Sequence, residues 1–453
     1  MTQPGSAEWF AEHLSERTKR GIAVETSALI RAGSLPMGTK LPPIRDLAFA
    51  LGVSPATISD AWSELRKQKI ITGRGRNGSW VSGDRIAAKP FRLAQVGNYG
   101  KNVFDLSRAA PDPALLPPLA RSLAYGAGAE NLNTYERIRI LPELQDAMSP
   151  SWPYRPEAFL ATSGGYNAVY TVLHAFFMAG SHIAIEDPTA LRLLDILEDL
   201  GARILPVACD ENGPLPESLS EAMQRKPAAF LFQPRLHAVT CRTVSEQRFA
   251  DLARVLDGSD TLIIEDDGMA DICTAVPQSL GTVFPDRVLH IRSLSKTLGP
   301  DLRLAVLSGP SRLVEQIQSF RSFGAGWTSR ILQSAAAWLL NDAETLQSVA
   351  RARSTYSARR RALLDALAER GFFLPDGEGF CLWVPVQSEQ FALVTLAARG
   401  IAVQPGSKFT VKPTHYLRIA TSTLRDRYEE VADAIIIAAE SYRGSGTRGL
   451  RGS

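Results

Sequence analysis

The sequence predicts a two-domain chain, in which a small helical module with a β-hairpin precedes a larger α/β domain. Its 453 residues exceed the length of one typical domain. From about residue 104 onward, apolar strand-like runs alternate with amphipathic helices, a pattern typical of a largely parallel sheet. Residues 1–83 carry a net charge of +4 and the remainder −1. This asymmetry is typical of a nucleic-acid-binding module attached to a neutral domain.

Composition excludes several classes of protein. The chain is 45% hydrophobic and 21% charged, as in ordinary soluble globular proteins. It has neither an apolar run of membrane length nor a basic-then-apolar N-terminal signal. Its four cysteines lie far apart without metal-type spacing: Cys209, Cys241, Cys273 and Cys381. We therefore expect a cytoplasmic protein with no membrane partner and no metal site.

The N-terminal module is predicted to contain three helices. Residues 9–31 carry spaced apolar residues, with a possible break near Gly21. Pro43 suits the first position of a second helix that runs to about Leu51. Ser54 can cap a third helix. The apolar face of this third helix would consist of Ile58, Ala61, Trp62 and Leu65.

A hairpin follows these helices. Ile70–Thr72 and Ser79–Val81 are predicted to pair around the basic, glycine-rich run Gly73–Gly78, which would form a wing. Two helices joined by a short turn form the helix-turn-helix, whose second helix enters the major groove. The same pattern also occurs where helices simply pack together, so a more specific motif is needed.

Such a motif is Gly-x-x-Leu-Pro-Pro-x-Arg, at residues 38–45. With the basic wing, it closely resembles the GntR winged helix, and this resemblance implies binding to double-stranded DNA. The expected DNA-facing residues are Lys40, Arg45, Ser54, Thr57, Ser59, Arg74 and Gly75. Lys40, Arg45 and Arg74 would mostly meet phosphates. Thr57 and Ser59 would read bases. Relatives often have an arginine at Pro55, so their operators do not transfer to this chain.

In the larger domain, a lysine follows a predicted buried strand. Val288–Ile291 is apolar and leads into Ser293-Leu294-Ser295-Lys296, with Arg303 seven residues further on. A lysine at the end of a buried strand is costly unless it is paired or chemically used. One use is a Schiff base with an aldehyde cofactor. The two hydroxyls and the guanidinium would suit a phosphate monoester. The alternative is a loop lysine without a role.

The run Ser293–Leu304 resembles the pyridoxal-phosphate lysine segment of the MocR-type regulators. These bacterial proteins join a GntR-like winged helix to a fold-type I aminotransferase domain. The resemblance implies a three-layer α/β/α fold with a smaller C-terminal α+β part. It also implies pyridoxal phosphate (PLP) as cofactor, an aldimine on Lys296, and a homodimer, domain-swapped, that binds an operator with two half-sites. Ser293, Ser295 and Arg303 would help hold the cofactor.

Two further segments support the cofactor. Ala161–Ala168 ends a strand and opens a helix, where the backbone at Gly165 and Tyr166 could cradle a phosphate, although a tight turn is the alternative. A second strand ends in Glu265-Asp266-Asp267. By the resemblance, Asp266 would keep a pyridine nitrogen protonated, whereas a solvated pair of carboxylates is the alternative.

Three more positions follow from the resemblance. Tyr135 matches a tyrosine that relatives lend to the phosphate of the neighbouring subunit. His237 precedes the segment that usually lies beside the cofactor, and we include it among the cofactor-binding residues. Arg418 lies inside an apolar strand, where it would clamp the carboxylate of an effector or take part in an internal ion pair.

Three positions depart from the family pattern. Gly268 replaces the tyrosine expected near the cofactor's phenolic oxygen, and Ala190 replaces the aromatic residue that usually stacks on the ring. Val239-Thr240-Cys241 replaces the usual Pro-Thr-Gly. These changes make the affinity for PLP less predictable than that of a typical member.

The predicted organisation has four parts: a winged helix at 1–82, a linker at 83–103, an aminotransferase-like sensor domain at 104–442 and a disordered tail at 443–453. We expect a transcriptional regulator rather than an enzyme, sensing PLP or a small amino compound. The alternatives are an active aminotransferase and a regulator whose PLP binding is weakened or lost.

Overall fold

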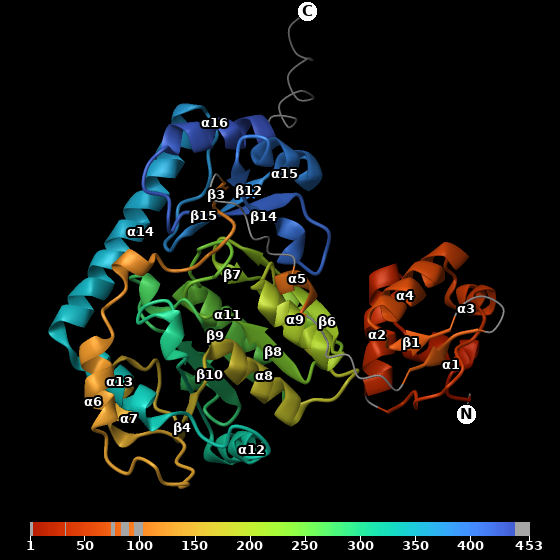
Figure 1. Ribbon diagram of the computed structural model, residues 1–453, viewed down its shortest axis with the longest axis horizontal. Helices are drawn as coiled ribbons and strands as arrows, with labels where there is room; N and C mark the ends of the chain where they lie inside the picture. The colour runs from red at the N-terminus through yellow and green to blue at the C-terminus, as the bar shows by residue number, and fades with distance from the viewer. Residues whose placement is uncertain (1–2, 32, 74–77, 83–89, 95–102, 440–453) are drawn as a thin grey trace, which may run out of the picture. The chain divides into compact units, whose positions relative to one another are not determined.

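The computed structural model describes residues 3–31, 33–73, 78–82, 90–94 and 103–439 (Figure 1). These residues form two compact units. The first contains the described residues up to Ala94 together with 176–181 and 195–203, and the second contains the other described residues. Arg74 and Gly75 of the predicted wing, most of the predicted linker and the predicted disordered tail lie outside the described residues.

The N-terminal part of the first unit is a winged helix-turn-helix. Its elements are α1 (Ala7–His13), α2 (Lys19–Arg31), α3 (Ile44–Leu51), α4 (Pro55–Lys67), β1 (Ile71–Thr72) and β2 (Trp80–Val81). Gly52 ends α3 in the left-handed conformation, at φ 66°. Ser54 caps α4, its Oγ accepting a hydrogen bond from the Thr57 amide at 3.1 Å. β1 and β2 pair antiparallel, so the predicted hairpin is confirmed.

The break between the first two helices differs from the predicted position. It falls between His13 and Lys19, whereas Gly21 lies inside α2. The reason is capping: the Thr18 hydroxyl accepts a hydrogen bond from the Gly21 amide at 3.0 Å, which starts α2 before the glycine. The predicted apolar face of α4 is buried, and Phe10 lies 6.0 Å from Trp62, ring centre to ring centre.

Four residues of the predicted linker form a short helix, α5 (Phe91–Ala94). The amides of Arg92 and Leu93 both donate to the carboxylate of Asp195, at 2.9 and 3.1 Å. The Arg92 guanidinium forms an ion pair with Glu198 at 2.8 Å. These contacts arrange a segment that has little periodicity in the sequence, which is why it was predicted as irregular.

The second unit is built on an eight-stranded sheet in the order β4-β11-β10-β9-β8-β5-β6-β7. Its strands are β4 (Ala158–Thr162), β5 (His182–Asp187), β6 (Arg203–Asp210), β7 (Gly213–Pro214), β8 (Ala229–Phe232), β9 (Leu262–Asp267), β10 (Val288–Ser293) and β11 (Ala305–Gly309). β5, β8, β9 and β10 are parallel, and β11 runs antiparallel to both of its neighbours. The parallel strands β8, β9 and β10 therefore present their carboxyl ends at one edge.

Helices surround this sheet (Figure 1). They are α6 (Ala120–Ala127), α7 (Pro142–Met148), α8 (Gly165–Phe176), α9 (Leu191–Leu200), α10 (Pro216–Met223), α11 (Glu246–Leu256), α12 (Ser311–Arg321) and α13 (Arg330–Asn341). Short 3₁₀ turns span Pro113–Leu115, Ser149–Ser151, Ala270–Ile272, Leu280–Thr282, Pro300–Leu302 and Gly406–Lys408. The predicted α/β domain is thus confirmed.

A smaller α+β part follows, as predicted. Its three-stranded sheet has the order β12-β15-β14, formed by β12 (Cys381–Pro385), β14 (Gln404–Pro405) and β15 (Tyr416–Ala420). β13 (Ile401–Ala402) pairs in parallel with β3 (Phe104–Asp105). The long helix α14 (Ala343–Glu369) packs with α16 (Tyr428–Ala439), which also contacts α15 (Glu389–Ala397). A shared apolar core joins these elements.

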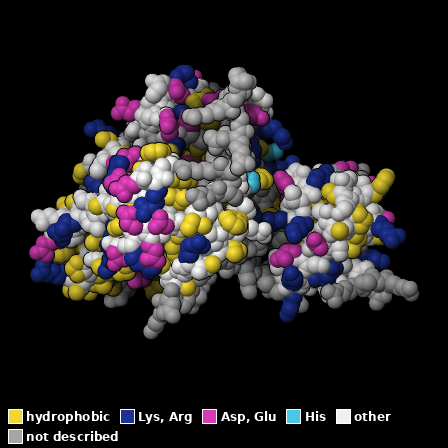
Figure 2. Space-filling model, turned by 90° about the horizontal axis from the view of Figure 1, so that it is seen from above, with side chains coloured by type: hydrophobic (Ala, Val, Ile, Leu, Met, Phe, Trp, Pro, Cys, Tyr) yellow, Lys and Arg dark blue, Asp and Glu magenta, His cyan; other side chains and the backbone are white. Residues whose placement is uncertain are grey.

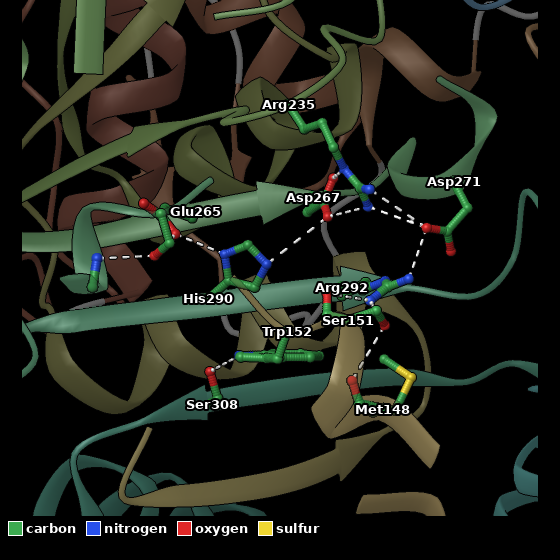
Figure 3. A network of polar contacts seen from close by, with 12 residues as sticks. Met148, Ser151, Trp152, Arg235, Glu265, Asp267, Asp271, His290, Arg292 and Ser308 are labelled. Carbon is green, nitrogen blue, oxygen red and sulfur yellow. Dashed lines mark hydrogen bonds and ion pairs between the residues drawn. The ribbon is translucent and has the colours of Figure 1, made fainter. Parts of the chain in front are cut away.

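A buried polar network holds the strand ends of the large sheet (Figure 3). Arg235 contacts Asp267 at 2.8 Å and Asp271 at 3.4 Å. Arg292 contacts Asp271 at 2.7 Å. Nearby, His290 lies 2.7 Å from Glu265. Because these side chains are largely inaccessible to water, each charge depends on its partner.

The buried ion pairs predict that a single substitution in this network strongly lowers the stability of the protein. Asp267→Asn removes the closest counter-ion of Arg235 without changing the side chain's shape. We expect it to lower the free energy of unfolding by about 3 kcal/mol, because the guanidinium stays buried. Urea denaturation followed by circular dichroism measures the loss. Asp251→Asn, which breaks an exposed pair with Arg254, should cost less than about 1 kcal/mol. Equal effects of the two changes would contradict this account.

Candidate functional site

Lys296 lies just beyond β10, and its Nζ donates a hydrogen bond to the backbone oxygen of Ala109 at 2.9 Å. Two residues earlier, the oxygen of Ser107 accepts a hydrogen bond from Arg418. One short segment therefore holds both cations. Burial lowers the pKa of Lys296 to about 8, the Cys381 thiol opposes this shift, and Arg418 and Arg192 add to it. The amine is consequently more nucleophilic at neutral pH than an ordinary lysine.

The predicted phosphate-side residues gather around the start of α8. A Cβ on Gly165 would lie 3.2 Å from Cβ of Ser293 and 3.7 Å from Asp266 Oδ1, so three segments meet there. Gly164, at φ 99°, lies against the guanidinium of Arg303. The hydroxyls of Ser293 and Ser295 are 3.0 Å apart. This concentration of hydroxyls, a helix start and a guanidinium is suited to an anion.

Asp266 is the last residue but one of β9, a strand that is buried along its whole length. Burial raises the pKa of its carboxyl to about 7, Asp267 adds to the shift, and a hydrogen bond from the Gln233 side chain opposes it. Gln233 itself is held by the Ala238 amide, which donates to its Oε1 at 3.0 Å. Gly268 also matters, since a Cβ there would lie 3.2 Å from Asp266 Oδ1. The missing side chain thus leaves room for the carboxylate.

Sequence analysis missed two residues of this site, Gln233 and Arg192. Gln233 directly follows β8, and its place at the carboxyl end of a parallel strand was the available signal. Arg192 lies in the first turn of α9, with its guanidinium 4.8 Å from the ring centre of Tyr166. No comparable sequence signal marks Arg192, because a cation at the start of a helix usually faces solvent.

Arg418 lies close to Lys296. Its guanidinium stacks 4.6 Å above the ring of Phe409, whose backbone oxygen accepts a hydrogen bond from Thr189, three residues before Arg192. Its Nε is buried without a hydrogen-bond partner, and the acceptor of its NH2 group is the backbone oxygen of Ser107 rather than a carboxylate. The structure thus has no internal ion pair for Arg418 among the described residues, and the carboxylate clamp stays a prediction.

His237 has partners within the protein. Its Nε2 lies 2.9 Å from the Pro188 oxygen, and its Nδ1 accepts hydrogen bonds from the amides of Val239 and Thr240. Burial lowers the pKa of the ring to about 4, so it is neutral at physiological pH. Because both nitrogens are engaged, a hydrogen bond from His237 to a cofactor would have to replace one of them. The predicted contact stays a prediction.

Tyr135 is 89% exposed, which is unusual for so large an apolar ring. The backbone on both sides of it is fixed, because the buried Arg330 donates to the oxygens of Thr134 and Glu136. Its ring lies 6.1 Å from that of Trp327, centre to centre. A rigidly presented, uncovered tyrosine is consistent with a role in a second subunit, which stays a prediction.

On the winged helix, Lys40, Arg45 and Ser54 are exposed, and Thr57 and Ser59 are partly exposed. Thr57 already bonds Ser54 through its hydroxyl at 2.8 Å, which leaves further hydrogen-bonding capacity on the same oxygen. On the face shown in Figure 2, basic side chains project from the surface of this module with acidic ones between them. Arg74 and Gly75 are not among the described residues.

The described residues contain no group of three or more metal-ligating side chains. Nor does that part of the chain contain a helix that is long and apolar enough to cross a membrane.

Comparison with known families assigns both modules. The model of the bacterial regulatory proteins of the gntR family matches residues 18–81. That of the aminotransferase class I and II family matches residues 101–435. The chain is also similar to solved aminotransferases. One is LysN, an α-aminoadipate aminotransferase from Thermus thermophilus, with a TM-score of 0.67 and 22% identity over 84% of this chain and 98% of that one. At this identity the likeness concerns the fold.

Two relatives match the chain over more than four-fifths of its length. The chain is 33% identical to the vitamin B6 salvage pathway transcriptional repressor PtsJ of Salmonella typhimurium, over 88% of this chain and 92% of the relative. It is 26% identical to the transcriptional regulator TauR of Rhodobacter capsulatus, over 84% and 87%. The predicted architecture is therefore confirmed: the chain belongs to the MocR-type transcriptional regulators, in which a GntR winged helix is joined to an aminotransferase class I and II domain.

Proposed function

We propose that this protein is a cytoplasmic, PLP-dependent regulator whose aminotransferase-like domain senses PLP or a small amino compound and whose winged helix binds operator DNA. The observation that carries this proposal is the half-buried Lys296, whose lowered pKa accompanies a cluster of anion-binding groups. When bound, PLP supplies an aldehyde that attaches reversibly to amines and a ring that withdraws electrons. The solved LysN structure contains a phosphopyridoxyl compound.

The residues present fit PLP in three respects. Arg303, the Ser293 and Ser295 hydroxyls and the start of α8 would hold a phosphate. Lys296 would hold the aldehyde carbon. Asp266, whose carboxyl is oriented by Gln233, would hold a protonated ring nitrogen, because a negative charge stabilises the proton there. Ala190 offers no ring for stacking, which weakens the fit on that side.

The effector site would lie around the guanidinium groups of Arg418 and Arg192, both of which are near enough to Lys296 to lower its pKa. Arg418 has a buried Nε without a partner, and Arg192 stands over Tyr166 with no carboxylate of the described residues beside it. Two unpaired guanidinium groups near an amine would attract the carboxylate of an amino compound. A ligand changes DNA binding only if it favours one conformation of the protein, so the effector must bind the DNA-competent and incompetent states unequally.

The first test concerns Lys296. Purified protein given PLP should develop a visible absorbance band, which borohydride should remove while leaving the label on Lys296. Attachment should accelerate as pH rises through about 8, because the neutral amine is the reactive form and its pKa lies there. Lys296→Ala should lose the band, whereas Lys412→Ala at an exposed position should keep it. If peptide mapping found the label on another lysine, this part of the proposal would be contradicted.

The second test concerns DNA. Lys40→Ala with Arg45→Ala should weaken binding to every sequence and reduce the salt-dependence slope by about 2, because each phosphate contact releases about one counter-ion. Fluorescence anisotropy over a range of salt concentrations measures both effects. Lys67→Ala, at the exposed C-terminal end of α4, is the matched control and should change the slope little. An unchanged slope in the double variant would place the DNA elsewhere.

The third test concerns assembly. Light scattering should give a dimer under PLP saturation, with an operator of two half-sites. Tyr135→Phe should preserve the dimer and weaken PLP binding about tenfold, because a hydrogen bond to a charged phosphate is lost. Tyr125→Phe removes a surface hydroxyl that contacts Glu143 and should have no such effect. A stable monomer would contradict the shared site.

Two assays on the wild-type protein distinguish a regulatory function from an enzymatic one. We expect a footprint on the DNA upstream of its own gene, altered by PLP or an amino compound, and no rapid multiple-turnover transamination. The winged helix and the loss of aromatic residues at Ala190 and Gly268 favour this outcome. Rapid transamination without any footprint would instead favour a working aminotransferase.

A further inference from the structure

Two cysteines 140 residues apart in sequence meet, and one of them, Cys381, is near enough to Lys296 for each to shift the pKa of the other. Cys241 lies in the loop between β8 and α11, and Cys381 is the first residue of β12. The amide of Cys381 donates a hydrogen bond to the Cys241 Sγ at 3.2 Å. Both side chains are free thiols and both residues are fully buried. This contact joins the large sheet's loops to the smaller α+β part.

The backbone is shaped to bring these thiols together. Cys241 adopts φ 57°, a conformation that non-glycine residues rarely hold without a compensating contact. Its oxygen accepts a hydrogen bond from the Glu378 amide at 3.0 Å. A Cβ on Gly377 would lie 2.4 Å from that oxygen, and one on Gly379 would lie 3.1 Å from the Cys241 Sγ. Glycines therefore permit the close approach of the two segments.

The electrostatic surroundings of the thiols are unequal. The Cys241 thiol, as hydrogen-bond partner, lowers the pKa of Cys381 below the usual range, and Arg418, Lys296 and Arg360 lower it further. The hydrogen bond with Cys381 and burial raise the pKa of Cys241. An inert buried cysteine behaves as a small apolar residue and has no such cationic environment. Cys381 is thus suited to attack an oxidant and Cys241 to resolve the product.

We propose that Cys241 and Cys381 are a redox-active pair that a hydroperoxide converts to a disulfide. The Cys381 thiolate attacks one oxygen of hydrogen peroxide and the O–O bond breaks, which leaves a sulfenic acid. The other oxygen leaves as hydroxide and takes up the proton that the Cys381 thiol lost on ionisation, so that one water is released. The Cys241 sulfur then attacks the Cys381 sulfur, and a second water leaves as the disulfide forms. Two thiols are oxidised and one molecule of hydrogen peroxide is reduced to two of water.

The disulfide would have two consequences for the domain. It would tie the loop that carries His237 to the strand β12, which pairs with β15 and its Arg418. It would also remove a thiolate that counteracts the low pKa of Lys296, so that pKa should fall further on oxidation. Peroxide would therefore alter the effector site without touching the winged helix.

The test uses the full-length wild-type protein without added cofactor, so its outcome does not depend on the proposed sensing function. After treatment with hydrogen peroxide and blocking of free thiols, peptide mapping should find a Cys241–Cys381 disulfide that dithiothreitol reverses. Oxidised protein should exchange the amide hydrogens of Glu378 and Cys381 more slowly, because the link holds both segments together. Cys381→Ser should slow oxidation at Cys241 by about tenfold or more, since the more acidic thiol is gone.

Two other cysteines provide the controls. Cys209 is more exposed than either member of the pair, and Cys273 is buried in the same apolar cluster. Cys209→Ser and Cys273→Ser should leave the disulfide and its rate unchanged. Oxidation that follows exposure and modifies Cys209 alone would overturn the proposal. So would a Cys381 that goes to sulfinic acid without a disulfide intermediate, or a disulfide with any other partner.

Discussion

Charge is buried where the parallel strands β8, β9 and β10 end, and this constrains the rest of the domain. An ionised group removed from water needs a counter-charge or several hydrogen-bond partners close by. Arg235 and Arg292 have such partners in Asp267 and Asp271. Arg418 has no such partner among the described residues. The ion pairs of Arg235 and Arg292 stabilise the fold. Arg418 has no counter-ion in the described part of the chain and is available to bind a ligand.

The same arrangement sets the chemistry of Lys296. Burial removes water from its amine and lowers its pKa. The positive charges of Arg418 and Arg192 lower this pKa further. Anions that neutralise these guanidinium groups would relieve this repulsion, so binding of a carboxylate and the protonation of Lys296 are coupled. A sensor can use this coupling, because one ligand then changes both the charge and the packing of a single site.

The departures from the family pattern also have a physical explanation in the structure. Gly268 leaves space that the Asp266 carboxylate approaches, and Gln233 orients that carboxylate. The His237 ring holds its own loop in place through a hydrogen bond to the backbone oxygen of Pro188. These contacts hold the polar groups of the site in place although Ala190 and Gly268 supply no aromatic ring. Catalysis of transamination demands a more closely positioned ring than reversible binding does, which favours sensing.

The sequence by itself determined the two modules, the helices and hairpin of the first module, and a few strands of the second. Proline, glycine and capping residues act within a few positions, so Pro43, Gly52 and Ser54 located α3 and α4. The motif around Lys296 was similarly local. Tertiary structure alone decided which distant residues meet: Gln233 with Asp266, Arg192 with Tyr166, and Cys241 with Cys381. Such pairs leave no periodic signal, because the folding of separate strands and loops brings them together.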